Sequence, residues 1–179
     1  MDANVGPFFN YAKNPLGSGA TARTGYGAVN GSTVEFVEGA NPGVRVITPP
    51  SGTRDIGVSL GGALTLFSAG LHRISVEVEG VQTESWRLSA QGSWVDRVTA
   101  SAPIRVESGE VKRISMSIQV NAEGTIQMYL LRSNTDVSGE LIIRKVQWPD
   151  VGIYLDGDTP GCQWLGVPGA SISGGYPPR

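Results

Sequence analysis

The sequence has 179 residues, of which 40% are hydrophobic and 17% charged, and its formal net charge at pH 7 is −2. This length suits one domain with its own core, and the hydrophobic content excludes a chain that is disordered throughout. Acidic and basic residues are interspersed, so no charge pattern indicates a nucleic-acid partner or an anionic membrane.

Counts of individual residue types narrow the fold class. The 25 glycines and 11 prolines predict many turns, which suits short strands better than long helices. The lone cysteine, Cys162, excludes an internal disulfide and a cysteine-based zinc site. No run reaches the roughly 18 apolar residues of a membrane-spanning helix. We therefore expect an all-β protein without a cofactor, made in the cytoplasm and not inserted in a membrane.

Short apolar runs separated by Gly, Pro, Ser and Asn clusters predict strands along most of the chain. In order they are TVEFVE, GVRVITP, RDIGVSL, HRISVEVEG, ESWRLSA, SWVDRVT, APIRVES, VKRISMSIQV, TIQMYLL and ELIIRKVQW. Asn30-Gly31, before the first run, is a strong turn signal. GGALTLFSAGL predicts an irregular or extended connection, because its glycines disfavour a helix. About nine or ten strands without helices between them predict a sandwich or barrel.

Strict alternation of apolar and polar residues predicts which strands lie next to each other. Residues 111–120 alternate, and after Asn-Ala-Glu-Gly the alternation resumes in residues 125–130, which predicts a β-hairpin. Residues 72–80 and 84–90 share this pattern and predict a second antiparallel pair. ELIIRKVQW has three consecutive apolar residues, which predicts a strand covered on both faces or distorted by a β-bulge. Because Pro149 ends that strand, we expect a body over residues 1–150 and an irregular, glycine-rich extension over residues 151–179.

The chain has a characteristic order of motifs: Asn14-Pro15 follows an aromatic stretch, a glycine-rich segment comes next, and later strands carry WRLS and GSWVDRV before a hydrophobic last strand. This order resembles the galactose-binding-like jelly roll of many carbohydrate-binding modules. The resemblance covers about residues 8 to 148. It implies an antiparallel β-sandwich of the jelly-roll type.

In the C-terminal extension, YLDGDTP at 154–160 is followed by WLG at 164–166 and ASIS at 170–173. This pattern resembles the ending of minor tail proteins of tailed bacteriophages that infect actinobacteria, with Leu155 where the family usually has Phe and Gly169 where His is common. The resemblance implies a virion component of the tail or tail tip, assembled in the host cytoplasm. It also implies several copies, contacts with other tail proteins, and host surface polysaccharide as a further partner.

Exposed aromatic residues are candidates for sugar binding, because the C–H face of a pyranose covers an aromatic ring. Tyr129 points away from Met128 and Leu130 in its strand, and Trp94 begins a strand beside Gly92. Gln127 lies on the face of Tyr129 and would set the orientation of a sugar. Two other tryptophans suit different roles: Trp86 shares the face of Leu88 and is expected in the core, and Trp148 is expected beneath the extension. These assignments give Tyr129, Trp94 and Gln127 as the carbohydrate candidates.

Two large aromatic residues of the extension, Trp164 and Tyr154, are candidate anchors. The segment is too rich in glycine to bury much apolar surface by itself, so we expect it to pack on the body or on neighbouring subunits. Asp156 and Asp158 supply hard oxygen ligands and are weak calcium candidates. The further acids of an EF-hand loop do not follow, and tight turns explain the Asp-Gly-Asp element as well.

No constellation of residues predicts catalysis. Glu77 and Glu79 alternate with core residues, so we expect them on a solvated outer face and not across a cleft. His72 lacks a nucleophile motif, and Cys162 lacks a neighbouring base. The residues therefore predict a protein that is not an enzyme, and the resemblance of the extension implies a structural protein of a phage tail. The alternatives are a non-catalytic carbohydrate-binding module and, last, a glycan-degrading enzyme.

Overall fold

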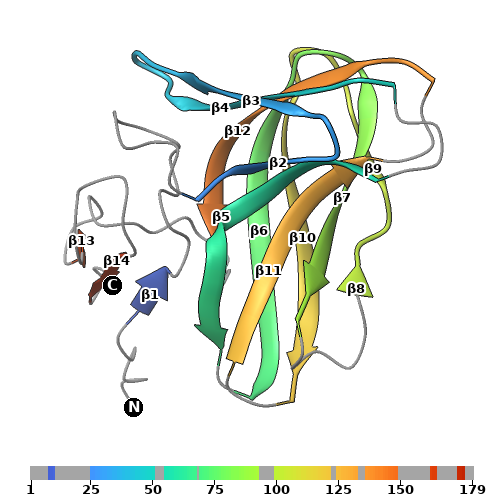
Figure 1. The fold of residues 1–179 in the computed structure, drawn as a ribbon. Coiled ribbons are helices and arrows are strands. Elements are labelled where there is room, and N and C mark those ends of the chain that lie inside the picture. Colours follow the sequence, from blue (N-terminus) through green and yellow to red (C-terminus); the bar gives the residue numbers. More distant parts are fainter. Residues whose placement is uncertain are drawn as a thin grey trace.

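A computed structural model describes residues 8–10, 25–50, 55–67, 69–92, 99–121, 124–132, 136–148, 162–164 and 173–175. The regular structure of these residues consists of β-strands, and every strand pairing is antiparallel (Figure 1). None of the described segments is a helix with the length and hydropathy to cross a membrane. The predicted all-β class is confirmed.

One layer of the molecule is a five-stranded sheet. Its strands, in spatial order, are β10 (Val111–Val120), β6 (Gly70–Gly80), β12 (Gly139–Gln147), β4 (Gly43–Thr48) and β3 (Thr33–Val37). β3 and β4 form a hairpin, whereas the other neighbours are distant in sequence. The sheet therefore depends on contacts between segments that the sequence separates widely.

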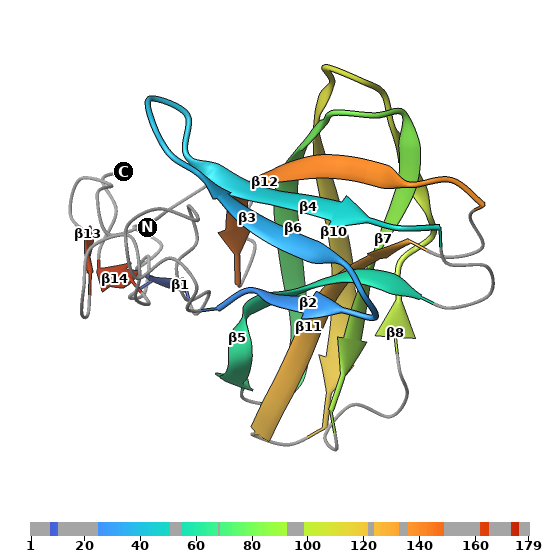
Figure 2. The ribbon, with the colours of Figure 1, turned by 45° about the horizontal axis from the view of Figure 1, so that its top comes forward.

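The second layer is a six-stranded sheet. Its spatial order is β2 (Gly27–Val29), β5 (Ile56–Phe67), β11 (Gly124–Arg132), β7 (Glu84–Gln91) and β8 (Thr99–Ala100), with β9 (Ile104–Val106) also paired to β7. The segment GGALTLFSAGL, expected as an irregular or extended connection, mostly continues β5 as a strand and then begins β6. The two layers form an antiparallel β-sandwich, seen from another side in Figure 2.

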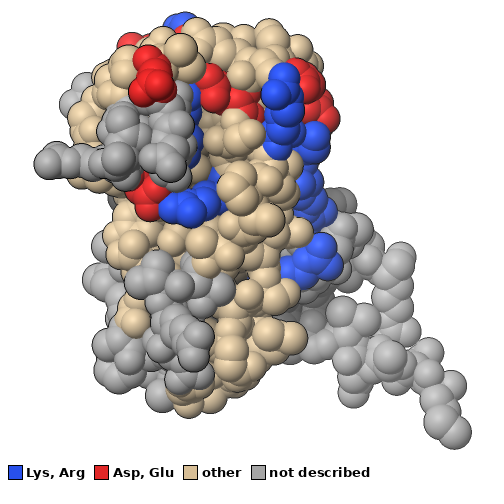
Figure 3. Space-filling view, turned by 90° about the vertical axis from the view of Figure 1, so that its right-hand side faces the viewer, with Lys and Arg blue, Asp and Glu red and all other residues tan. Residues whose placement is uncertain are grey.

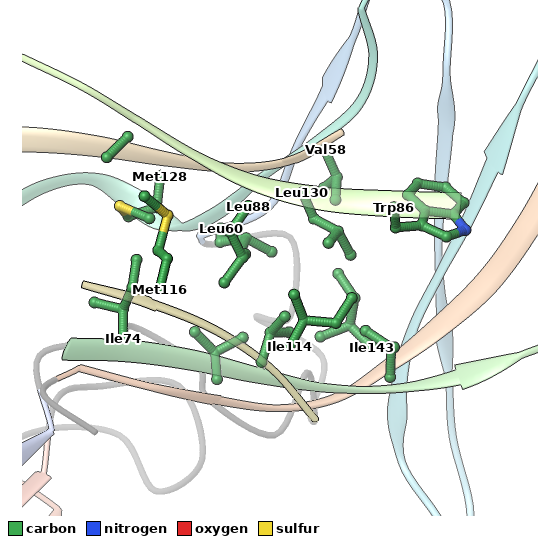
Figure 4. Close-up of a cluster of buried hydrophobic side chains, with 14 of the residues drawn as sticks. Val58, Leu60, Ile74, Trp86, Leu88, Ile114, Met116, Met128, Leu130 and Ile143 are labelled. Atoms are coloured by element: carbon green, nitrogen blue, oxygen red, sulfur yellow. The ribbon is translucent and has the colours of Figure 1, made fainter. Parts of the chain in front are cut away.

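The core lies between the two sheets, where the apolar positions of each strand meet. Figure 4 shows Ile74, Ile114 and Ile143 of the five-stranded sheet on one side of this layer, with Leu60, Leu88 and Leu130 of the other sheet opposite them. Each such side chain contributes about 1.5–3 kcal/mol through burial. Trp86 is 0% exposed and Trp148 is 1% exposed, so the core position predicted for Trp86 is confirmed and Trp148 belongs to the same cluster.

The predicted hairpin between residues 111–120 and 125–130 is wrong. β10 pairs with β6 in the five-stranded sheet, whereas β11 pairs with β5 and β7 in the other sheet. The second predicted pair is also wrong, because β6 and β7 lie in different sheets. Alternation requires only that one face of each strand is buried, and two strands facing each other across a core satisfy it as well as two hydrogen-bonded neighbours.

Two local predictions are confirmed. Asn30 and Gly31 both have positive φ, 51° and 88°, as expected at the centre of a tight turn. β12 contains a register shift between Ile143 and Lys145, which is the second of the two alternatives predicted from its three consecutive apolar residues. The shift brings Arg144 and Lys145 to the outer face of the sheet, where they pair with Glu79 and Glu77.

Part of the expected irregular extension is regular. β13 (Cys162–Trp164) and β14 (Ser173–Gly175) pair with each other, and β14 also pairs with β1 (Phe8–Asn10). This three-stranded sheet, drawn beside the sandwich in Figures 1 and 2, joins a segment near the start of the sequence to two near its end. Glycine-rich segments thus obtain backbone hydrogen bonds from a distant strand, which local patterning does not reveal.

Candidate functional site

The outer face of the six-stranded sheet carries the predicted residue Tyr129 near its centre. In the strand register Tyr129 of β11 lies between Ser59 of β5 and Ser89 of β7. Its side chain is half-buried, whereas Met128 and Leu130 on either side are fully buried in the core. Because both cross-strand neighbours are serines, no large side chain lies directly opposite the ring on the adjacent strands.

The row extends to β2, where Gly27 lies opposite Ser59. The Ser59 hydroxyl accepts a hydrogen bond from the Gly27 N–H at 2.9 Å and lies 3.3 Å from the Gly27 carbonyl oxygen, to which it donates. A Cβ added to Gly27 would lie 2.8 Å from this hydroxyl oxygen. Because Gly27 has no side chain, the backbone of β2 can approach Ser59, and nothing projects from Gly27 above the sheet at this end of the row.

The next row along the sheet consists of two amides. Gln127 of β11 lies opposite Gln91 of β7. Gln91 is exposed, and Gln127 is half-buried with its Nε2 donating to the Met128 carbonyl oxygen at 3.3 Å. Each amide offers both donors and an acceptor. The predicted pair of Tyr129 and Gln127 therefore lies on one face, beside a second glutamine that sequence analysis did not select.

On the other side of Tyr129, a cavity of about 160 Å³ opens near the ends of β7 and β11. It is lined by Ser85, Trp86, Arg87, Pro103, Leu131 and Arg132. Arg87 Nη2 donates to the carboxylate oxygens of Asp55 at 2.8 and 2.7 Å. Arg132 donates to Glu84 at 2.9 Å and to the Thr48 hydroxyl at 2.8 Å, and its guanidinium carbon lies 5.8 Å from the centre of the Trp86 ring. Two cationic side chains thus lie in fixed positions at this cavity.

Three donor atoms of the lining residues are buried and have no acceptor. They are the indole Nε1 of Trp86, the Nε of Arg87 and the Nε of Arg132, whose other guanidinium nitrogens are bonded. A buried polar group without a partner costs about 1–3 kcal/mol, so such groups are few in native proteins. A ligand that brings acceptor oxygens to this cavity would recover part of that cost. These donors went unnoticed in the sequence because alternation identified Trp86 only as a core residue.

Charged side chains of the described residues are largely engaged with one another. Figure 3 shows acidic and basic side chains side by side on one flank of the molecule. Glu77 and Glu79, expected on a solvated outer face, lie on the outer face of the five-stranded sheet in ion pairs with Lys145 at 3.0 Å and Arg144 at 2.6 Å. They are therefore on the opposite side of the sandwich from Tyr129.

The remaining predicted site residues are only partly described. Trp94, Tyr154, Asp156 and Asp158 lie outside the described residues. Trp164 belongs to β13 and pairs with Ser173 through the backbone. Among the residues that the structure describes, no group of three or more His, Cys, Asp or Glu side chains is placed to hold a metal ion. The anchor and calcium predictions stay predictions.

Comparison with known proteins establishes the fold. Neither protein-family models nor curated proteins match the sequence. Among solved structures, the chain is similar to the CBM22-1 xylan-binding domain of Paenibacillus barcinonensis Xyn10C, with 14% identity and a TM-score of 0.58 over 82% of this chain and 95% of that one. A CBM22 xylan-binding domain, formerly called x6b, gives 9% identity and a TM-score of 0.58, covering 86% of this chain and all of that one.

A third similar structure is TmCBM61 in complex with β-1,4-galactotriose, with 13% identity and a TM-score of 0.54 over 78% of this chain and 97% of that one. The three neighbours are carbohydrate-binding modules. The β-sandwich of this chain is therefore of the same jelly-roll type, as the sequence predicted.

Proposed function

We propose that this chain is a non-catalytic carbohydrate-binding domain that holds a polysaccharide on the outer face of its six-stranded sheet. The observation that carries the proposal is the arrangement on this face: Tyr129 between two serines, next to a cavity whose lining residues Trp86 and Arg87 have buried donors without acceptors. The fold shared with carbohydrate-binding modules supports it.

The chemistry of the face suits a sugar. The ring of Tyr129 offers an apolar surface to the C–H face of a pyranose, and the small side chains of the neighbouring serines leave room for the sugar. Gln127 and Gln91 offer donors and acceptors to hydroxyl groups on one side. Arg87 offers a buried donor on the other side. Binding here needs no bond to be made or broken, so the proposed role is adhesion to a polymer.

Binding measurements with defined oligosaccharides test the proposal. Xylohexaose and β-1,4-galactotriose are the first probes, because the similar solved structures include xylan-binding domains, a complex with xylohexaose and a complex with β-1,4-galactotriose. Calorimetry with wild-type protein is expected to give a dissociation constant between about 1 mM and 1 μM for one of them or for a related glycan. Tyr129→Ala is expected to weaken binding about tenfold or more, which corresponds to about 1.4 kcal/mol.

Leu71→Ala is the matched control, because Leu71 is 73% exposed and lies in the five-stranded sheet. Like Tyr129→Ala it removes a large side chain, but from the opposite layer, and it is expected to bind like wild type. Silence of the wild-type protein across a broad glycan panel would contradict the proposal. Equal binding by Tyr129→Ala and wild type would show that the ligand lies elsewhere.

The sequence of the extension favours a more specific setting for this domain. Residues 154–173 resemble the ending of phage minor tail proteins, and on that basis we place the domain in a virion tail or tail tip. There it would form a homo-oligomer, contact other tail proteins and touch host surface polysaccharide. The mass of the purified protein in solution and immunogold labelling of virions test this setting. A monomer that labels no tail would contradict it, without bearing on carbohydrate binding.

A further inference from the structure

Gln147, the last residue of β12, is a buried amide without partners. It lies on the outer face of the five-stranded sheet opposite Ser75 of β6 and is 1% exposed. Neither its Oε1 nor its Nε2 has a hydrogen-bond partner. Ser75 beside it is also buried, at 4% exposure. A buried amide that leaves both a donor and an acceptor unused is costly, so a group that satisfies it is expected at this place.

A small cavity lies against this amide. Its volume is about 20 Å³, and it is lined by Ser75, Glu77, Arg113, Lys145 and Gln147. This volume is enough for about one water molecule or one hydroxyl group. Every lining residue is polar or charged, and the Gln147 amide is unsatisfied, so an occupant with hydrogen-bonding groups is favoured over an apolar one. The amide fixes which polar group fits best.

The oxygen and the nitrogen of the Gln147 side-chain amide need different hydrogen-bond partners. Oε1 of Gln147 accepts and Nε2 donates. A carboxylate or phosphate oxygen only accepts, and an ammonium group only donates, whereas a hydroxyl group does both. The small cavity is therefore suited to a hydroxyl group, whether it belongs to water or to a ligand.

A larger groove adjoins the small cavity and shares Glu77 and Lys145 with it. The groove has a volume of about 220 Å³ and is lined by Asn41, Pro42, Glu77, Glu79, Val111, Arg144 and Lys145. Two ion pairs, Glu77 with Lys145 at 3.0 Å and Glu79 with Arg144 at 2.6 Å, lie along it. Arg144 is further fixed because it donates to the carbonyl oxygens of Asn41 and Pro42. Charged donors and acceptors in fixed positions suit hydroxyl groups, and Val111, which is 57% exposed, adds an apolar contact.

We propose that this groove and the small cavity beside it together form a second saccharide site, in which the Gln147 amide in the small cavity binds one hydroxyl group of a sugar whose ring lies in the groove over the two ion pairs. The site is on the opposite layer of the sandwich from Tyr129. The inference rests on the proposed carbohydrate binding for its ligand class, and on Gln147 and its groove for its place. Two sites on opposite faces allow one domain to bridge two polysaccharide chains.

A nuclear magnetic resonance titration of the full chain separates the two sites. The probes are xylohexaose, β-1,4-galactotriose and any glycan that binds in calorimetry, and the signals are backbone amides of β11 and of β12 together with the Gln147 side-chain amide. Both groups of signals are expected to shift in the wild type. Gln147→Met, which keeps most of the volume, is expected to weaken binding at β12 about tenfold or more and to leave the β11 shifts unchanged.

Tyr129→Ala is expected to give the reverse result, with shifts at β12 and none at β11. Without ligand, Gln147→Met is expected to unfold at the same temperature as wild type or a higher one, because it removes an unsatisfied amide. If Gln147→Met does not fold, Glu79→Gln tests the same groove through its ion pair and is expected to weaken the β12 shifts several-fold.

The outcomes are distinct. Shifts at β11 alone, with the Gln147 amide unmoved at saturation, mean that the small cavity holds an ordered water only, and they overturn the second site while carbohydrate binding stands. Shifts at β12 alone support the second site and overturn the Tyr129 site. No shift with any glycan overturns both.

Discussion

Arg87 of β7 and Asp55, the residue before β5, are joined across the outer face of the six-stranded sheet by hydrogen bonds of 2.8 and 2.7 Å. β11 lies between those two strands, so the arginine side chain crosses it. Leu131 of β11, the register partner of Arg87, is only 4% exposed although it points away from the core. The pair therefore shields an apolar residue and fixes the arginine at the edge of the proposed sugar site.

Arg87→Lys is expected to weaken glycan binding about fivefold to tenfold, because lysine has no donor equivalent to Nε and cannot keep the planar guanidinium geometry. The pair is partly exposed, so its loss is expected to cost at most about 1 kcal/mol of stability. Calorimetry and chemical unfolding of the same samples measure the two effects. Asp55→Asn, which leaves Nε in place, is the comparison: binding weakened as much as in Arg87→Lys would mean that Nε does not touch the ligand.

Removal of the buried cation Arg132 is expected to destabilise the fold strongly. Its side chain is 1% exposed and bonds Glu84, so Arg132→Met leaves a carboxylate without its partner at a cost of about 3–5 kcal/mol. The double variant Arg132→Met with Glu84→Leu removes both charges and is expected to recover most of that loss. Urea unfolding gives the comparison. A double variant no more stable than Arg132→Met would mean that packing around the arginine, and not its charge, holds this end of the sandwich.

Gly57 of β5 is expected to tolerate no side chain. A Cβ there would lie 2.1 Å from the carbonyl oxygen of Leu130, a backbone atom that cannot turn aside. Gly57→Ala is therefore expected to cost about 3 kcal/mol or more, at the upper end of the usual range for overpacking. Gly27→Ala meets only the Ser59 hydroxyl oxygen, which can rotate, and is expected to cost about 1 kcal/mol. Thermal unfolding that ranks the two variants in the opposite order would refute the strand spacing described between β5 and β11.

Stability is expected to fall below about pH 4.5 partly through two carboxylates at the surface, Glu107 and Glu110. Hydrogen bonds from Arg105, and then Thr83, lower the pKa of Glu107. The backbone N–H of Glu107, and then Lys112, lower the pKa of Glu110. A carboxyl group whose pKa is lower in the folded state stabilises the fold above its unfolded pKa, and this contribution is lost as the pH falls through the folded value.

Melting temperatures between pH 7 and pH 3 measure this effect. The double variant Glu107→Gln with Glu110→Gln is expected to lose less stability on acidification than wild type. Glu38→Gln, at an exposed position after β3, is the control and is expected to follow the wild-type curve. Parallel curves for wild type and the double variant would mean that these carboxylates do not sense folding.

The alternation of apolar and polar residues in the sequence correctly predicted on which face of a strand several side chains lie. It placed Trp86 in the core and placed Tyr129 and Gln127 on the outer face of a strand, and the structure confirms these positions. Alternation did not identify Gln147, because ELIIRKVQW has consecutive apolar residues and a bulge. Counting residues along this strand therefore does not predict which face Gln147 occupies. Alternation also did not find Arg87, since its partner Asp55 is distant in sequence and lies two strands away.

By itself the sequence determined the β class and the inward and outward positions of most side chains, because side chains alternate with the backbone pleat. The strand pattern left a sandwich or a barrel open, and the resemblance to carbohydrate-binding modules implied the sandwich. Only the tertiary structure decided which strands are neighbours: β10 pairs with β6 and not with β11. The physical reason is that pairing is made by backbone hydrogen bonds, which every residue except proline offers alike, so the choice among partners depends on how the whole core closes. The same closure brings Ser59, Tyr129 and Ser89 into one row and leaves Gln147 facing the small cavity.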